Sequence, residues 1–244
     1  MTGMAHRTVR GRIRYTSKKP EMMDRERGRE WFAFTHHGDG AVTLRAQCEI
    51  EEPAPTVLRD IVYSLDADGR PFDCLVRLTV GDRFMGSGLI TFHGSANLAT
   101  CVSHGPSIGR IEQTLPINAS VDGFGTHPIV GDGYLTRCID TSNGPTGRTI
   151  HVLVPSPDHR GATPPMLARV SIDLEYLGDE TVTVAAGTFD CRKFQFIDRS
   201  EAGMGGNQHP AYQMWVTADD DALFVQGGVG GYMATWYELV ELIR

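Results

Sequence analysis

The stretch FDCLVRLTVGDRFMGSGLITFH, residues 72 to 93, decides the fold class. From Phe72 to Val80 every second residue is apolar, which is the pattern of a strand with one buried face. Gly81 and Asp82 give a turn signal, and a second strand-like run then extends to His93. Two such runs around a short turn predict an antiparallel hairpin. The glycines inside the second run indicate a β-bulge or a close approach of another backbone.

Similar runs lie on both sides of this hairpin, separated by turn signals such as Gly38-Asp39-Gly40. On the N-terminal side and just beyond the hairpin, strands are expected at residues 9–15, 30–37, 41–49, 57–65, 98–104 and 111–115. In the C-terminal part they are expected at 168–178, 181–185, 189–197, 210–217 and 222–225, with turns at 178–180 and 219–221. The run 232–243 permits a strand or a short helix, and Thr235, Trp236 and Tyr237 favour the strand.

No long segment has helical periodicity, so the sequence predicts an all-β or β-rich α+β protein. We expect one domain, 1–244, built as a curved antiparallel sheet or open barrel. Within it, 1–121 would form a first meander, 122–166 an irregular central loop region, and 167–244 a second β half.

The segment VTVAAGTFDCRKFQF, residues 182 to 196, is followed by QMWVT at 213–217 and ALFV at 222–225. This pattern resembles a bacterial domain family of unknown function that carries a V-x-V-x-A-G-T-F-D hairpin. The resemblance implies an incurved antiparallel sheet, similar in outline to lipoprotein-carrier folds. It is strongest over the C-terminal third, where Gly187 would make the turn and Val182, Val184 and Phe189 would pack.

Composition limits the classes of function. The formal net charge is -7, and the chain lacks the basic footprint of a nucleic-acid binder. No apolar run reaches the roughly 20 residues that span a bilayer, and the first residues lack the apolar segment of a secretory signal. We therefore expect a cytoplasmic protein with no membrane partner. The five cysteines form no C-x-x-C pair, which argues against a zinc ribbon or a redox site.

Residues 155–165, PSPDHRGATPP, form the first candidate site. Prolines fix the loop, and functional residues often lie on loops held in this way. His159 could act as a general acid or base together with Asp158, and Arg160 could hold a carboxylate or an enolate oxygen. Alternatively, Asp158 caps a turn and Arg160 forms a structural ion pair.

Residues 124–134, FGTHPIVGDGY, form the second candidate. His127 precedes a proline, which predicts extended backbone there. Asp132 between two glycines suits a tight turn or a ligand that approaches the backbone, and Tyr134 could donate to a developing oxyanion. The alternative is a Gly-Asp-Gly turn beside a surface histidine. Cys138 with His151 is a further, less supported pair for thiol chemistry.

The spacing of His127, His151 and His159 matches no local metal motif, so no metal site is expected. Aromatic residues on the strands could line a pocket. Trp215 lies on the opposite strand face from Tyr212 and Met214, so only one of these faces can do so.

Together these observations predict a cofactor-independent lyase, isomerase or hydratase that acts on a small apolar or aromatic molecule. The expected catalytic residues are His127, His159, Asp158 and Tyr134. The expected substrate-binding residues are Arg160, Asp132, His151 and Trp215. Two alternatives stay open: a non-catalytic carrier of a hydrophobic ligand, and an assembly module in which the central region packs against a second copy in a homodimer.

Overall fold

The computed structural model describes residues 6–117, 121–199 and 208–244. In these residues, fifteen strands form a single sheet. The first eight strands are β1 (Arg7–Ser17), β2 (Glu26–His36), β3 (Val42–Ile50), β4 (Val57–Leu65), β5 (Pro71–Val80), β6 (Arg83–His93), β7 (Leu98–Gly105) and β8 (Gly109–Pro116). The others are β9 (Gly123–Phe124), β10 (Thr146–Val154), β11 (Ala168–Val184), β12 (Gly187–Asp198), β13 (Tyr212–Thr217), β14 (Phe224–Val229) and β15 (Thr235–Ile243).

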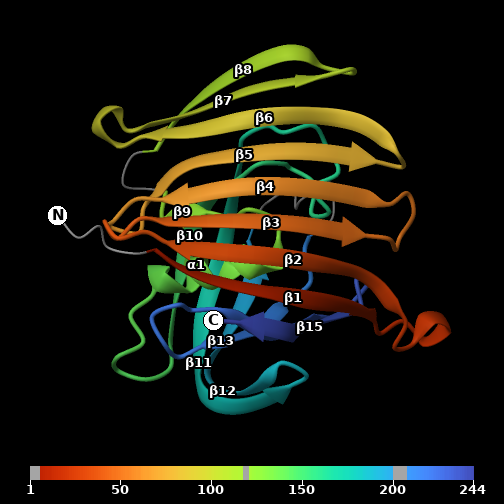
Figure 1. Ribbon diagram of the computed structural model, residues 1–244, viewed down its shortest axis with the longest axis vertical. Coiled ribbons are helices and arrows are strands. Elements are labelled where there is room, and N and C mark those ends of the chain that lie inside the picture. Colours follow the sequence, from red (N-terminus) through yellow and green to blue (C-terminus); the bar gives the residue numbers. More distant parts are fainter. Residues whose placement is uncertain (1–5, 118–120, 200–207) are drawn as a thin grey trace.

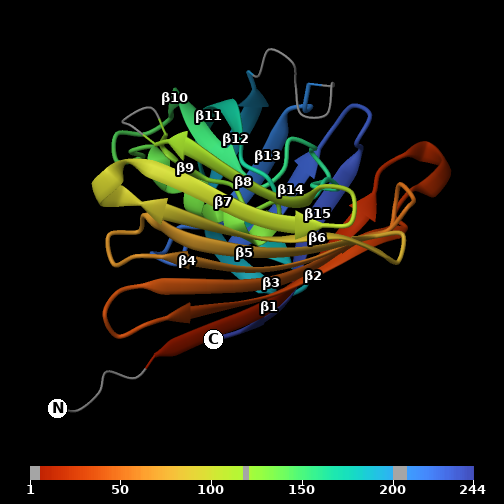
Figure 2. The same cartoon turned by 90° about the horizontal axis from the view of Figure 1, so that it is seen from above.

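The strand order is β8-β7-β6-β5-β4-β3-β2-β1-β15-β14-β13-β12-β11-β10-β9. The sheet is therefore two meanders joined along one seam, where β1 pairs antiparallel with β15. Its two ends, β8 and β9, do not pair with each other, so the sheet is curved but not closed. Figures 1 and 2 show the second meander passing behind the first, with the central region between them.

The short helix α1 (Asp132–Leu135) and the adjoining 3₁₀ helix η3 (Ile129–Gly131) lie in the central region. Three other 3₁₀ helices are η1 (Pro20–Met22), η2 (Gly94–Ala96) and η4 (Thr136–Cys138). The α1–η3 segment fills the space between the two meanders. A Cβ atom added to Gly133 would lie 2.1 Å from the carbonyl oxygen of Ala222, and Tyr134 packs against Phe34 with ring centroids 5.3 Å apart.

Inward-facing residues of both meanders and of the central region share one apolar core. Phe34 and Leu44 come from the first meander, Phe124 from the central region, and Phe194 and Leu239 from the second. All five are at most 2% exposed. Burial of this alternating set makes the sheet curve around its contents, because each strand has only one apolar face.

The predicted hairpin at residues 72–93 is confirmed as β5 and β6, and the final run is confirmed as the strand β15. The glycines of β6 mark a close backbone approach. A Cβ atom added to Gly88 would lie 2.8 Å from Cβ of Pro165, and one added to Gly86 would lie 3.2 Å from Cδ of the same proline. The loop 155–165 therefore packs on the inner face of β6 and β7.

Three local predictions are wrong. Residues 146–154 form the strand β10, which the polar sequence from Thr146 to Thr149 conceals. β11 continues through residues 178–180 with a register shift, where a turn was predicted. His127 has φ +71, a left-handed conformation, although it precedes a proline. The chain bends there. No helix in the described part of the chain is long and apolar enough to span a bilayer.

Candidate functional site

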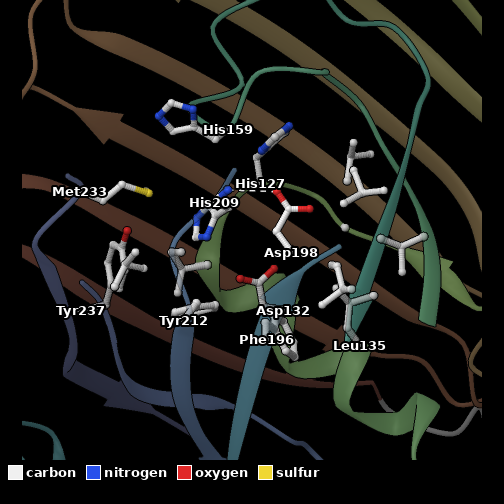
Figure 3. A pocket seen from close by; sticks show the side chains of 17 residues that line it. His127, Asp132, Leu135, His159, Phe196, Asp198, His209, Tyr212, Met233 and Tyr237 are labelled. Atoms are coloured by element: carbon white, nitrogen blue, oxygen red, sulfur yellow. Dashed lines mark hydrogen bonds between the residues drawn. The ribbon is translucent and has the colours of Figure 1, made fainter. Parts of the chain in front are cut away.

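A cavity of about 150 Å³ lies between the central region and the inner face of the second meander. Its walls are mainly apolar, and its polar side chains come from His, Asp and Tyr residues. The lining residues are Gly125, His127, Ile129, Asp132, Leu135, Val152, Val154, His159, Val170, Ile172, Phe196, Asp198, His209, Tyr212, Val229, Met233 and Tyr237 (Figure 3).

His127 provides a neutral imidazole. Loss of solvation, with a smaller effect of the Arg59 charge, lowers the pKa of His127 to about 3, and a hydrogen bond to the backbone of Ser156 acts in the opposite direction. The Nε2 atom is buried and has no hydrogen-bond partner among the described residues. Since Nδ1 is left to make the bond to Ser156, Nε2 is the nitrogen that can accept a proton.

His209 is a second neutral imidazole in the same cavity. Its Nδ1 lies 2.7 Å from the carbonyl oxygen of Pro210. A carbonyl can only accept, so Nδ1 carries the proton and Nε2 is unprotonated. Burial is the largest effect and lowers the pKa of His209 below its ordinary value.

Asp132 provides a buried carboxyl group whose surroundings disfavour the charged form. Burial, followed by the nearby charge of Glu30, holds the pKa of Asp132 well above its ordinary value. Within the described ranges no hydrogen-bond donor contacts its carboxyl oxygens, in contrast to Asp198, whose Oδ2 accepts from the backbone N–H of His209 at 3.0 Å. In the view of Figure 3, Asp198 lies between Asp132 and His127.

Glu30 lies beneath the cavity and positions it. Its side chain has no exposed surface. Oε2 accepts from the hydroxyl of Tyr15 at 2.6 Å and from the N–H of Ile129 at 2.9 Å, and Oε1 accepts from the N–H of Val130 at 3.0 Å. These bonds tether η3 to β2, and with it the segment that carries His127 and Asp132.

Of the eight predicted site residues, the structure brings three into this cavity: His127, Asp132 and His159. His159 lies at the mouth, in an edge contact with Tyr232 at 5.8 Å between centroids. Its Nδ1 is 3.6 Å from Oδ1 of Asp158, which is too long for a hydrogen bond.

The other five lie outside the cavity wall. Asp158 caps its own loop, accepting from the N–H of Ala162 at 2.8 Å. The guanidinium group of Arg160 donates to the carbonyls of Pro53 and Pro55. Tyr134 lies beneath the guanidinium group of Arg137, which is 4.3 Å from the ring centroid.

His151 is exposed on β10 and contacts Ser171 through Nδ1 at 2.9 Å. Trp215 belongs to a small cluster on the outer face of the sheet, and its Nε1 donates to Glu180 at 2.8 Å. Tyr212 lines the cavity from the opposite face of the same strand, as the alternation predicted.

Asp198, His209 and Glu30 were not predicted. The sequence pattern contains a signal for two of them. Glu30 is in phase with Phe32 and Phe34, and Asp198 is in phase with Phe194 and Phe196, so both continue an apolar alternation with a carboxylate. A charged residue in phase with buried neighbours is a signal of a functional or tethering group. Among the described residues, no three His, Cys, Asp or Glu side chains gather closely enough to hold a metal ion.

Comparison with solved structures supports the fold. The chain is similar to a beta-barrel-like protein of the domain of unknown function DUF1849 from Brucella abortus, with a TM-score of 0.61, 10% identity and 96% of each chain covered. This likeness confirms the expected incurved antiparallel sheet and its resemblance to bacterial proteins of unknown function.

Two more distant similarities are to a DUF1089 family protein from Pseudomonas aeruginosa and to a protein with a YmcC-like fold from Bacteroides fragilis. The first has a TM-score of 0.43, 11% identity and coverage of 83% of this chain and 89% of that one. The second has a TM-score of 0.37, 10% identity and coverage of 97% and 95%. No protein-family model and no curated relative matches the sequence.

Proposed function

We propose that the protein binds a small apolar or aromatic molecule in this cavity and moves a proton on it, as a lyase, isomerase or hydratase. One observation carries the proposal: a neutral imidazole, His127, and a buried carboxyl group with a raised pKa, Asp132, line the same apolar cavity. The opposite shifts favour the unprotonated imidazole, which can take a proton, and the protonated carboxyl group, which can give one.

In this scheme Nε2 of His127 takes the proton from the bound molecule, and Asp132 donates a proton to it. The hydroxyl of Tyr212 is buried and without a partner among the described residues. It replaces Tyr134 as the proposed donor to a developing oxyanion, because Tyr134 lies outside the cavity. Asp158 has no part in the scheme, since its carboxylate is used within its own loop.

The test is hydrogen–deuterium exchange at carbon. The probe is 1-phenylpropan-2-one in D₂O, followed by NMR, with wild-type protein, His127→Gln and Asp132→Asn. We expect the wild type to exchange the probe faster than buffer alone does. In each variant the rate of protein-catalysed exchange should fall by about 10²- to 10⁴-fold, as for removal of a general acid or base. His93→Gln is the matched control, because His93 is exposed on β6, does not line the cavity and hydrogen-bonds through its ring to Thr100. Equal rates in all four proteins would refute the scheme.

A second candidate function is binding without chemistry. The observation that favours it is the apolar wall contributed by Val152, Val154, Val170, Ile172 and Val229. A carrier would retain affinity for the probe in His127→Gln and Asp132→Asn and would show no wild-type exchange. Calorimetric titration of the same probe separates the two functions.

A further inference from the structure

A second hollow of about 110 Å³ adjoins the cavity. It lies toward the first meander and is lined by residues of β1, β2, β3, β4 and β15, of the loops beside these strands and of the central region. Five residues line both spaces and therefore form the boundary between them: His127, Ile129, His159, Met233 and Tyr237.

The second hollow differs from the cavity in its charge. Among the residues that the structure describes, the side chains lining it include four cations and no carboxylate; the cations are Lys19, Arg27, Arg59 and Arg160. The nearest paired carboxylate is Glu52, which lies 2.6 Å from Nζ of Lys19 and 3.1 Å from Nε of Arg27. The carboxylate of Glu52 thus forms ion pairs with two cations.

Arg59 and Arg160 make no ion pair with any described carboxylate. The guanidinium group of Arg59 donates to the carbonyl oxygens of Arg160 and Gly161, at 2.5 and 2.9 Å. The charge of Arg59 acts on Glu30, which already accepts three hydrogen bonds. The charges of Asp158 and Glu52 act on Arg160 without forming an ion pair with it. Arg59 is 1% exposed, and Nε of Arg160 is buried without a partner among the described residues.

Buried positive charge is costly unless an opposite charge lies nearby. Here the excess positive charge faces a hollow of ligand size, and a planar guanidinium group matches the geometry of a carboxylate or a phosphate. Exposed Tyr232 and partly exposed Lys19 stand at its rim, which provides a route for an anion from solvent.

We propose that this hollow binds the anionic group, carboxylate or phosphate, of a ligand whose apolar part lies in the cavity. The inference rests on the proposed function, because it takes the cavity as the site of the apolar part. It narrows the substrate class to small aryl or alkyl acids and phosphate esters. Because His127 and His159 form the boundary, the atoms next to the anionic group would lie beside the imidazoles.

The test compares matched probes by calorimetric titration: 4-phenylbutyrate, its uncharged counterpart 4-phenylbutan-1-ol, and 3-phenylpropyl phosphate. We expect the wild type to bind at least one anion about tenfold or more tightly than the alcohol, and to lose that preference at high salt. Whichever anion binds more tightly identifies the acidic group.

The variants are Lys19→Gln and Arg160→Gln, each expected to weaken anion binding about tenfold and to leave alcohol binding unchanged. Lys18→Gln is the control, because Lys18 is the neighbouring residue with the same charge but pairs with Asp24 outside the hollow. Arg160 also holds two backbone carbonyls, so thermal unfolding of each variant checks its fold. Lys19→Gln, which disturbs only a side-chain pair, keeps the test valid if Arg160→Gln unfolds.

Equal affinity for the alcohol and both anions would overturn the anion site and leave the cavity as a binding site. Failure of every probe to bind would overturn both. Tight anion binding that depends on Lys19, without any deuterium exchange, would support the anion site and refute the proposed chemistry.

Discussion

Glu30 is the residue on which the geometry of the site depends. It is fully buried, and burial outweighs its three hydrogen bonds, so the pKa of Glu30 is raised from 4.5 to about 7. In the unfolded chain Glu30 loses its proton near pH 4.5, whereas the folded protein retains it until about pH 7. Between these values the folded state binds more protons, and stability therefore falls as pH rises through this interval.

The predicted contribution is about 2–3 kcal/mol between pH 5 and pH 8. Glu30→Gln cannot ionise, so its free energy of unfolding should lack this decrease. Urea denaturation of both proteins at pH 5 and pH 8 measures the difference. Glu112→Gln, on an exposed strand, is the control, because Glu112 lies at the surface beside Arg110. If Glu30→Gln kept the wild-type pH dependence, the assigned pKa would be wrong.

At this scale the sequence predicted three cavity residues, His127, Asp132 and His159. It also singled out Tyr134, Asp158, Arg160 and His151, which the structure places outside this cavity, with Arg160 in the wall of the second hollow. Loop residues have no periodicity, so nothing in the sequence tells which way such a side chain points. Trp215 lies outside the cavity for a different reason: the alternation placed it correctly, opposite Tyr212, but did not tell which face was the inner one.

At the scale of elements, β6 and the loop 155–165 are fitted to each other. The closest point is Gly88, where a Cβ atom would lie 2.8 Å from Cβ of Pro165 and 3.0 Å from Cβ of Ser103. Neither of these Cβ atoms is at the end of a flexible side chain, so neither can easily move aside. The loop also carries His159, so a shift here would reach the boundary between the two hollows.

Gly88→Ala should therefore lower the free energy of unfolding by about 1–3 kcal/mol, the usual cost of an overpacked contact. It should also weaken binding of the phenylbutyrate probe. Gly94→Ala is the matched control, because nothing lies within 4 Å of its added Cβ atom. Chemical denaturation with calorimetry measures both effects, and an unchanged stability for Gly88→Ala would show that the loop does not rest on β6.

The strands with clean alternation were predictable because one buried face fixes the period, as in β5 from Pro71 to Val80. β10 was not, because only its second half is apolar while Thr146–Thr149 lies exposed. The position of β10 follows from its pairing with β11. Strand pairing is part of the tertiary structure, and the local sequence does not encode it.

For the molecule as a whole, one core contains residues of both meanders, so we predict a single unfolding transition. The three tryptophans allow a test: Trp31 lies on β2, and Trp215 and Trp236 lie on β13 and β15. The variant Trp31→Phe keeps tryptophan fluorescence only in the second meander. The double variant Trp215→Phe/Trp236→Phe keeps it only in the first. In each variant the urea midpoint from fluorescence should equal that from circular dichroism. Unequal midpoints would mean two domains.

The β1–β15 seam has a consequence for biosynthesis. β1 pairs with β15, the last strand along the chain, from Arg10 opposite Ile243 to Ser17 opposite Thr235. During synthesis on the ribosome, the first meander is therefore complete before β15 exists. Until β15 is made, the edges of β1 and β8 are both unpaired and could pair with strands of other nascent chains. Arg12 and Arg14 stand on the outward face of β1 and meet Glu241 and Glu238 only when β15 is added. Until then they are uncompensated like charges, which repel a second copy from the edge that β15 will occupy.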